Sequence, residues 1–136
     1  MAGINISMDK ASKALDAKYM SIQEMSAKID IQQQALVMLE GSGLDDSYIQ
    51  AKIRDYRETI MAMKGELAKA KVEMVEDFLL LTDPALVDLL NKRYVSNMTW
   101  EKIAEQAGTT VRWVQLMRNN VLHQIVKAKE ETKNSL

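Results

Sequence analysis

The sequence contains no cysteine, one proline and five glycines among its 136 residues. Without cysteine the chain can form neither disulfides nor thiolate metal sites, and we expect it to work in a reducing, cytoplasmic environment. An all-β fold would need more turn residues and more β-branched and aromatic residues than are present, since Phe occurs only once. Hydrophobic residues nevertheless make up 47% of the chain, enough for a packed core. This composition predicts an all-α protein.

Long hydrophobic runs are also missing. Residues 78–81, Phe-Leu-Leu-Leu, are one of the longer runs and none exceeds five residues, whereas a helix that crosses a bilayer needs about 20 apolar residues. The first ten residues mix polar and small side chains and lack the apolar region of a secretion signal. We therefore expect a soluble, intracellular protein with no membrane partner.

The chain has no large surplus of either charge, and its formal net charge is −1. Residues 83–136 hold eight Lys and Arg against six Asp and Glu, whereas residues 1–82 hold ten against thirteen. Strong DNA binders often carry a marked basic surplus. Any nucleic-acid contact is therefore expected in the C-terminal part, and the modest affinity of one copy favours a homodimer or a second protein.

Gly41 and Gly43 separate two long amphipathic stretches, which predict helices over about residues 8–40 and 46–81. Apolar residues recur in the second stretch at alternating spacings of four and three, at Ile49, Ile53, Tyr56, Ile60, Met63, Leu67, Ala70 and Met74. This is the pattern of a coiled-coil seam. Because the link is short, an antiparallel hairpin is favoured. Residues 1–82 are thus predicted to form a helical hairpin that associates as a homodimer.

The remaining residues, 83–136, read as three shorter helices over about 84–96, 99–107 and 110–129. Asp83 can cap the first of them, and Pro84 suits its first turn. Gly108 can adopt the positive φ that a tight turn requires, and Thr110 can cap the last helix. The combination of small Ala104, a Gly turn and a polar cap predicts a helix-turn-helix DNA-binding domain.

In a helix-turn-helix the second helix places its first turns in the major groove. The predicted recognition helix covers about residues 111–125. Outward-facing candidates for DNA contact on it, together with two cations on the supporting helices, are Val111, Arg112, Gln115, Arg118, Asn119, Lys102 and Arg93. Arg pairs with guanine, Gln with adenine and Val with the thymine methyl group, while Lys suits phosphate. Trp113 is expected to pack back on the preceding helix, and Trp100 to cover the core edge.

A recurrent motif is carried by Leu89, Arg93, Tyr94, Thr99, Trp100, Glu101, Ile103, Ala104, Gly108, Thr110, Arg112, Trp113 and Val114. The segment that holds them, residues 89–122, resembles region four of bacterial sigma factors. It is more similar to small phage and prophage proteins of the ArpU- and RinA-like kind. The resemblance implies a phage- or prophage-encoded transcriptional regulator that works in a bacterial host cell on double-stranded DNA, with RNA polymerase as a further partner.

Nothing in the sequence indicates catalysis, a cofactor or a metal site. The single histidine, His123, has no Cys or Ser-Gly partner nearby, and Asp45 and Asp46 are better placed to cap a helix than to bind a metal. The Gly-Ser-Gly link lacks the Lys and the preceding strand of a phosphate loop. We therefore expect a protein that is not an enzyme.

Two alternatives to a DNA-binding regulator stay open. In the first, the coiled coil binds RNA polymerase or another phage protein, and the helix-turn-helix contacts little or no DNA; the low net charge favours it. In the second, the chain is a DNA-packaging small subunit, which also joins a helix-turn-helix to long helices. There the DNA-binding unit is N-terminal, so this alternative fits less well.

Overall fold

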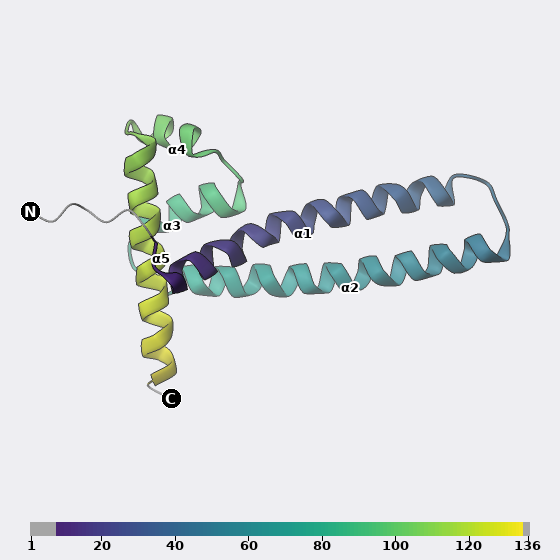
Figure 1. Ribbon diagram of the computed structural model, residues 1–136, viewed down its shortest axis with the longest axis horizontal. Helices are drawn as coiled ribbons and strands as arrows, with labels where there is room; N and C mark the ends of the chain where they lie inside the picture. Colours follow the sequence, from purple (N-terminus) through teal and green to yellow (C-terminus); the bar gives the residue numbers. More distant parts are fainter. Residues whose placement is uncertain (1–7, 135–136) are drawn as a thin grey trace, which may run out of the picture. The chain divides into compact units, whose positions relative to one another are not determined.

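The computed structural model describes residues 8–134, and this part of the chain is all-α, as predicted (Figure 1). Its elements are α1 (Lys10–Glu40), α2 (Ser47–Phe78), α3 (Pro84–Leu90), a π-helical turn η1 (Asn91–Val95), α4 (Trp100–Ala107) and α5 (Val111–Asn134). None of these helices is long and apolar enough to cross a membrane. Residues 1–7, on which part of the secretion-signal prediction rests, lie outside the described residues.

The long helices begin at acidic caps. The carboxylate of Asp9 accepts the N–H of Ser12 at 2.7 Å, and Asp46 accepts the N–H of Tyr48 at 2.7 Å, which is the capping role predicted for the Asp45-Asp46 pair. Helix α2 ends at Phe78, three residues before its predicted end. There the N–H groups of Leu80 and Leu81 bond three residues back, and this tightening of the last turn closes the helix.

The predicted helix over residues 84–96 contains a π turn in its second half. After α3, the N–H of Ser96 donates to the carbonyl of Asn91 at 2.9 Å, five residues back. Asn97 then takes a positive φ of 55°, which Asn tolerates better than most residues. The chain thereby turns sharply into α4 while Tyr94 stays buried.

The chain divides into two compact units. Unit 1 consists of residues 8–20 and 74–134 of the described chain, and unit 2 is Ser21–Glu73. The units therefore do not follow the predicted boundary between residues 82 and 83. The physical reason is an aromatic cluster in unit 1, where the ring of Tyr19 from α1 lies 5.5 Å from that of Phe78 and 5.2 Å from that of Tyr94.

The core of unit 1 is built from every helix that enters it. Its buried apolar residues are Leu15, Tyr19, Met74, Phe78, Leu86, Leu90, Tyr94, Ile103, Ala104, Val114, Val121, Leu122 and Ile125. Five of these are completely buried, and three of the five, Val121, Leu122 and Ile125, lie in the middle of α5. Helix α5 is therefore anchored most deeply by its central part, and Val114 anchors its first turn as well.

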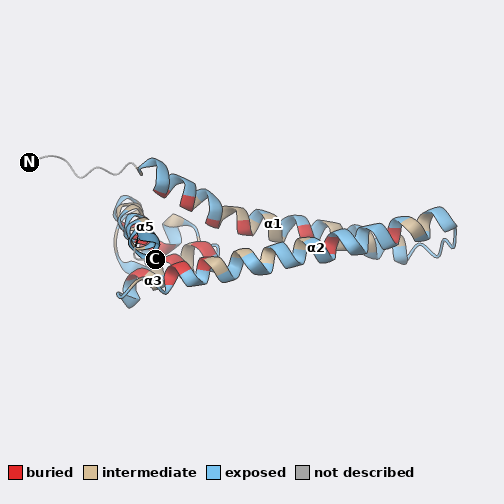
Figure 2. Cartoon of the chain, turned by 90° about the horizontal axis from the view of Figure 1, so that it is seen from below, coloured by how far each residue is buried: buried red, intermediate tan, exposed pale blue. Residues whose placement is uncertain are grey.

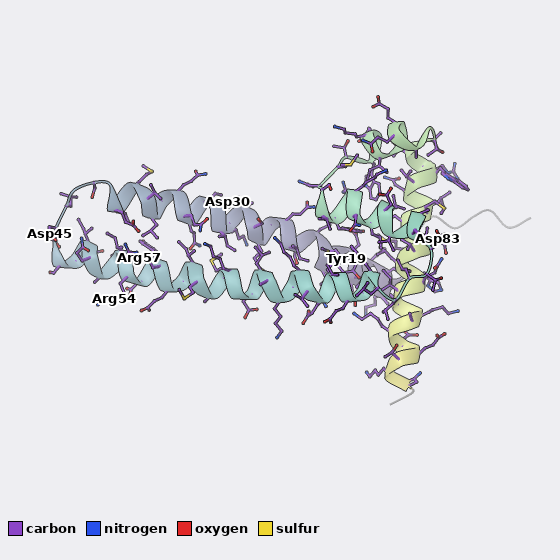
Figure 3. All side chains as sticks on the ribbon, turned by 180° about the vertical axis from the view of Figure 1, so that it is seen from behind. Tyr19, Asp30, Asp45, Arg54, Arg57 and Asp83 are labelled. Atoms are coloured by element: carbon purple, nitrogen blue, oxygen red, sulfur yellow. The ribbon has the colours of Figure 1, made fainter. Side chains whose placement is uncertain are left out.

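In unit 2 the remaining parts of α1 and α2 run antiparallel, side by side (Figures 1 and 2). Four isoleucines are buried between them, Ile22, Ile29, Ile53 and Ile60. Near the tip, Arg57 pairs with Glu40 at 3.2 Å (Figure 3). Tyr56 departs from the predicted seam, because its side chain is 43% exposed although its neighbours in the repeat are buried.

Candidate nucleic-acid interface

The turn between α4 and α5 is closed by backbone hydrogen bonds. Gly108 ends α4 in the left-handed conformation, with φ 66° and ψ 35°, as its position predicted. The N–H of Thr109 donates to the carbonyl of Ala104 at 3.0 Å, and the N–H of Gly108 to that of Glu105 at 3.2 Å. This pair of bonds is the Schellman motif, which satisfies the last carbonyls of a helix and sets the direction in which the chain leaves it.

Threonine side chains cap the starts of both helices. The hydroxyl oxygen of Thr99 accepts the N–H of Lys102 at 3.2 Å, and that of Thr110 accepts the N–H of Trp113 at 3.1 Å. Each replaces an intrahelical bond that the first turn of a helix lacks. The caps and the Gly108 turn are local features, and the turn and the Thr110 cap lie where the sequence predicted.

A small apolar core joins α4 to α5. Ile103, Ala104 and Val114 are buried in it. Partly buried neighbours complete this core, namely Leu89, Met98, Trp100 and Val111. Trp100 covers the edge of this core, as expected. Val111 also contributes to it, so only part of this side chain remains available to contact a thymine methyl group.

Arg118 was expected to face outward, but it lies in the interior of unit 1. Its side chain is only 14% exposed, and its Nη1 atom lies 3.5 Å from the carboxylate of Asp16 on α1. Its Nε atom donates to the Asn119 side chain at 2.7 Å, and its guanidinium carbon lies 4.9 Å from the centre of the Trp100 ring. Arg118 therefore connects α5 to α1 and α4 inside unit 1.

Arg93 is also directed inward. Its Nη1 atom donates to the carbonyl of Met98 at 3.1 Å, and its guanidinium carbon lies 4.4 Å from the centre of the Trp100 ring. Arg93 and Arg118 thus both contact the same indole, and a cation over a tryptophan ring is attracted by the electron-rich face. Two of the four cations predicted to touch DNA are used to hold Trp100 in place.

The other predicted residues remain at the surface to different degrees. Arg112 and Lys102 are exposed, whereas Gln115 and Asn119 are partly buried at the side of α5. Trp113 was expected to pack back on α4, but 51% of its surface is exposed. The acidic residues Glu101 and Glu105 are exposed on α4. The surface around the turn is therefore nearly balanced in charge, with a large aromatic ring beside its one arginine.

The spacing along α5 contained a signal for the interior position of Arg118. Val114, Arg118, Val121 and Ile125 stand at intervals of four, three and four, so they share one face of a helix. A cation at a core position of this kind is expected to have an internal partner. That partner, Asp16, lies 102 positions earlier in the chain and could not be identified from local spacing.

Two buried tyrosines donate hydrogen bonds to carboxylates on the long helices, and each carboxylate also pairs with a cation on α5. Tyr94 donates its hydroxyl to Asp16 at 2.5 Å, and Tyr19 donates to Asp77 at 2.7 Å. Burial, aided by the neighbouring carboxylate, raises the pKa of each tyrosine hydroxyl above its usual range. Lys129 on α5 completes the second group, with its ammonium 3.2 Å from Asp77. Neither aspartate was predicted from the sequence, although Asp77 interrupts the apolar repeat that runs through Ala70 and Met74.

A further contact, at the surface, joins α5 to the residue that caps the start of α1. The Nδ1 atom of His123 lies 3.1 Å from the carboxylate of Asp9, and both side chains are about half exposed. The backbone N–H of Ser12 is the main cause of a lowered pKa at Asp9. His123 is thus a surface residue with a carboxylate partner, in keeping with a structural position.

Neither a protein-family model nor a curated protein nor a solved structure matches this chain. Between residues 8 and 134, no three His, Asp or Glu side chains gather as a possible metal site.

Proposed function

We propose that this chain is a sequence-specific DNA-binding transcriptional regulator that places the start of α5 in the major groove. The observation that carries the proposal is the segment from α4 to α5, in which a Schellman turn at Gly108 separates two capped helices packed through Ala104. Beyond this turn, Arg112 is exposed on the first turn of α5. This is the arrangement that presents a recognition helix to a groove.

Each surface residue has a specific role in this proposal. Arg112 reads guanine, and Gln115 reads adenine from the flank of α5, with Asn119 one turn further along. Lys102 and the free N–H groups at the start of α5 contact phosphate. Arg93 and Arg118 act as positioning residues that keep Trp100 and α5 in place without touching DNA. The chain is not an enzyme in this proposal, and it needs no cofactor.

The resemblance to phage and prophage regulators supports the same function and adds the bacterial cytoplasm as its location and RNA polymerase as a second partner. One copy supplies few cations at the turn. A homodimer joined through the hairpin would double the contacts and read two half-sites, as many helix-turn-helix proteins do.

A selection from random duplexes at low salt, followed by salt titration, tests this function. We expect enrichment of one sequence and binding that weakens as salt rises, since bound cations release counterions. On the selected duplex, Arg112→Ala should cost about 1–3 kcal/mol, and Lys102→Ala should lower the salt slope by about 1. Arg54→Ala, which removes an exposed cation from α2, is the matched control and should bind like the parent.

The proposal fails if no duplex is enriched at low salt. The recognition-helix assignment fails separately if the Arg112→Ala and Gln115→Ala variants bind the selected duplex with the affinity of the parent.

A second candidate function is a protein-interaction module, and the exposed ring of Trp113 favours it. A tryptophan with half of its surface exposed, next to Arg112 and close in sequence to acidic Glu105, resembles the anchor residues of protein interfaces. In this case purified RNA polymerase should retain the chain in equal amounts and lose it with Trp113→Ala, while no DNA is bound at low salt.

A further inference from the structure

Only one stripe of inner residues is buried on each helix of unit 2. On α2, Ile53 and Ile60 are buried. Tyr56, which stands between them in the repeat, is 43% exposed, and Met63, the next residue of the repeat, is only partly buried. Helix α1 repeats this division. Ile22 and Ile29 are buried there, while Met25, Gln32 and Leu39 follow one another at intervals of seven and are only partly buried.

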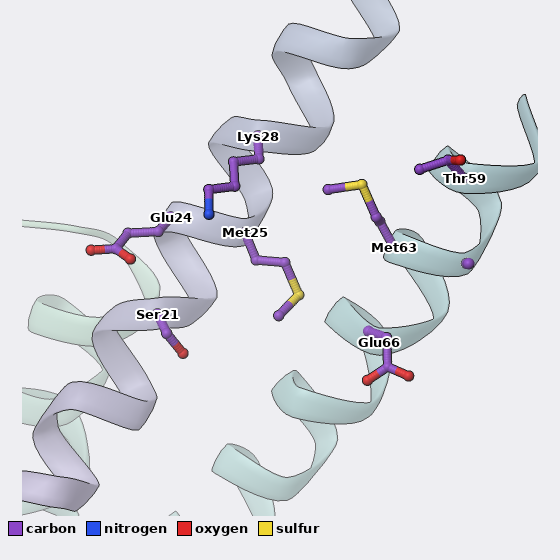
Figure 4. Close-up of a pocket in the computed structure, with 8 residues that line it drawn as sticks. Ser21, Glu24, Met25, Lys28, Thr59, Met63 and Glu66 are labelled. Carbon is purple, nitrogen blue, oxygen red and sulfur yellow. The ribbon is translucent and has the colours of Figure 1, made fainter. Parts of the chain in front are cut away.

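One residue of each half-open stripe lines a groove between the two helices. This groove has a volume of about 570 Å³, with Met25 and Met63 at its apolar centre. Figure 4 shows these two side chains extending from α1 and α2 into the space between the helices. Its polar lining includes Glu24, Lys28 and Glu66. Methionine is flexible and polarizable, which suits a surface that packs against a second layer.

We propose that this groove face of unit 2, defined by Met25, Gln32, Leu39, Tyr56 and Met63, packs against the same face of a second copy to form a four-helix bundle. In such a bundle each helix packs against two neighbours and needs two apolar stripes. The stripe facing the partner helix of the same chain is already buried. A second copy carries the matching pair of half-open stripes, so it supplies the missing layer.

The size of the face fits a stable dimer. The parts of α1 and α2 in unit 2 are on the order of 30–40 Å long at about 1.5 Å per residue. Two packed helices with axes about 8–10 Å apart present a face roughly 20 Å wide. The resulting area, on the order of 600–800 Å² per copy, is close to the ~800 Å² per partner of an ordinary stable interface.

The charges along the groove are self-complementary. Lys28 and Glu24 line the α1 edge, and Glu66 lies on the α2 edge, so both signs line the groove. A two-fold axis brings each surface patch against its own copy in reverse order. Under that symmetry, Lys28 of one copy is free to meet a glutamate of the other, whereas a groove edge of one sign would repel itself.

The outer face of α2 supplies a matched control. Met61 is only two residues from Met63, yet it is 76% exposed and points to the other side of the helix, because successive residues turn by about 100°. Met61→Lys therefore changes the same residue type on the same helix outside the proposed interface.

Sedimentation equilibrium of the full chain at up to about 100 µM tests the interface. The parent should have twice the 15.4 kDa mass of one chain. Met63→Lys should raise the dimer dissociation constant at least about 100-fold, because each dimer loses two buried apolar side chains. Met61→Lys should change this constant less than about threefold. Tyr56→Lys, at a more exposed position, should also weaken the dimer, and far-UV circular dichroism reports whether each variant is folded.

A parent that stays monomeric at the highest concentration overturns the proposal, as does a Met61→Lys variant that dissociates as readily as Met63→Lys. A folded Tyr56→Lys variant with unchanged dimer affinity also overturns it. Self-association through unit 2 is independent of DNA binding, so each can fail without the other.

Discussion

Replacing Arg118 by alanine should destabilise the fold and leave the surface proposed to read DNA in place. Arg118 lies on the recognition helix predicted from the sequence, but its guanidinium contacts Asp16, Asn119 and Trp100 inside unit 1. The Arg118→Ala variant removes these three contacts together with the packing of the aliphatic part of the side chain. Asp16 keeps the hydrogen bond from Tyr94, so its carboxylate retains one partner.

The magnitude follows from the environment of each contact. A partly buried cation over a tryptophan ring contributes about 0.5–1 kcal/mol. The ion pair with Asp16, whose side chain is 24% exposed, contributes about 0.5–1 kcal/mol. The hydrogen bond to Asn119 contributes about 0.5–1 kcal/mol. Together these give a loss of roughly 1.5–3 kcal/mol, which lowers the melting temperature by about 5–10 °C in a protein of this size.

The assay compares Arg118→Ala with Arg112→Ala in urea and thermal unfolding followed by circular dichroism. Arg112 is exposed, and its replacement should change the free energy of unfolding by less than about 0.5 kcal/mol. On a selected duplex the order should reverse: Arg112→Ala binds more weakly, while Arg118→Ala stays within about threefold of the parent well below its melting temperature. If the two variants are equally stable, the internal role of Arg118 is wrong.

Two other perturbations test the turn and the buried tyrosines. Gly108→Ala should destabilise the fold by about 1 kcal/mol, because φ there is 66° and alanine disfavours the left-handed region. Gly65→Ala within α2 should instead stabilise the fold by about 0.5–1 kcal/mol, because alanine favours a helix more than glycine does. Urea titrations of both variants check the opposite signs. Tyr19→Phe should cost about 1–2 kcal/mol by removing the hydrogen bond to Asp77. The raised pKa of folded Tyr19 means that this hydroxyl contributes full stability below its unfolded pKa of 10.0 and loses it as pH rises toward the folded value. The parent should therefore lose stability above pH 10 more steeply than Tyr19→Phe, and equal slopes in alkaline unfolding would contradict this role.

The local features of this fold were predictable from the sequence because they depend on a few neighbouring residues. The caps at Thr99 and Thr110 and the positive φ of Gly108 each follow from the chemistry of one turn. The helix positions follow from apolar spacing and from the breaks at glycine and proline. The π turn after α3 was not predicted, since nothing in the residues 91–95 distinguishes it from an ordinary helical turn.

Long-range contacts account for what the sequence analysis missed. Local spacing predicts that Arg118 faces the groove and that Arg93 touches phosphate from a supporting helix, whereas tertiary packing places Trp100 against both guanidinium groups. Asp16 meets Tyr94 across 78 positions and Asp77 meets Tyr19 across 58. Tyr56 fits the coiled-coil repeat, yet a regular repeat does not say which of its positions a single partner helix will cover.

The core of unit 1 includes residues from the start of α1 and the end of α2, and this limits how the protein can be divided. A fragment that starts at residue 83 would lack Leu15, Tyr19 and Phe78, and its tyrosine and arginine on α3–α5 would lose the carboxylate of Asp16. Helices α3–α5 are therefore not an independent folding unit that recombination could transfer alone. The hairpin of unit 2 is different, because it lies between the two parts of unit 1 in the sequence. Adding or removing one heptad in both α1 and α2 would change its length and leave the residues that complete unit 1 unchanged.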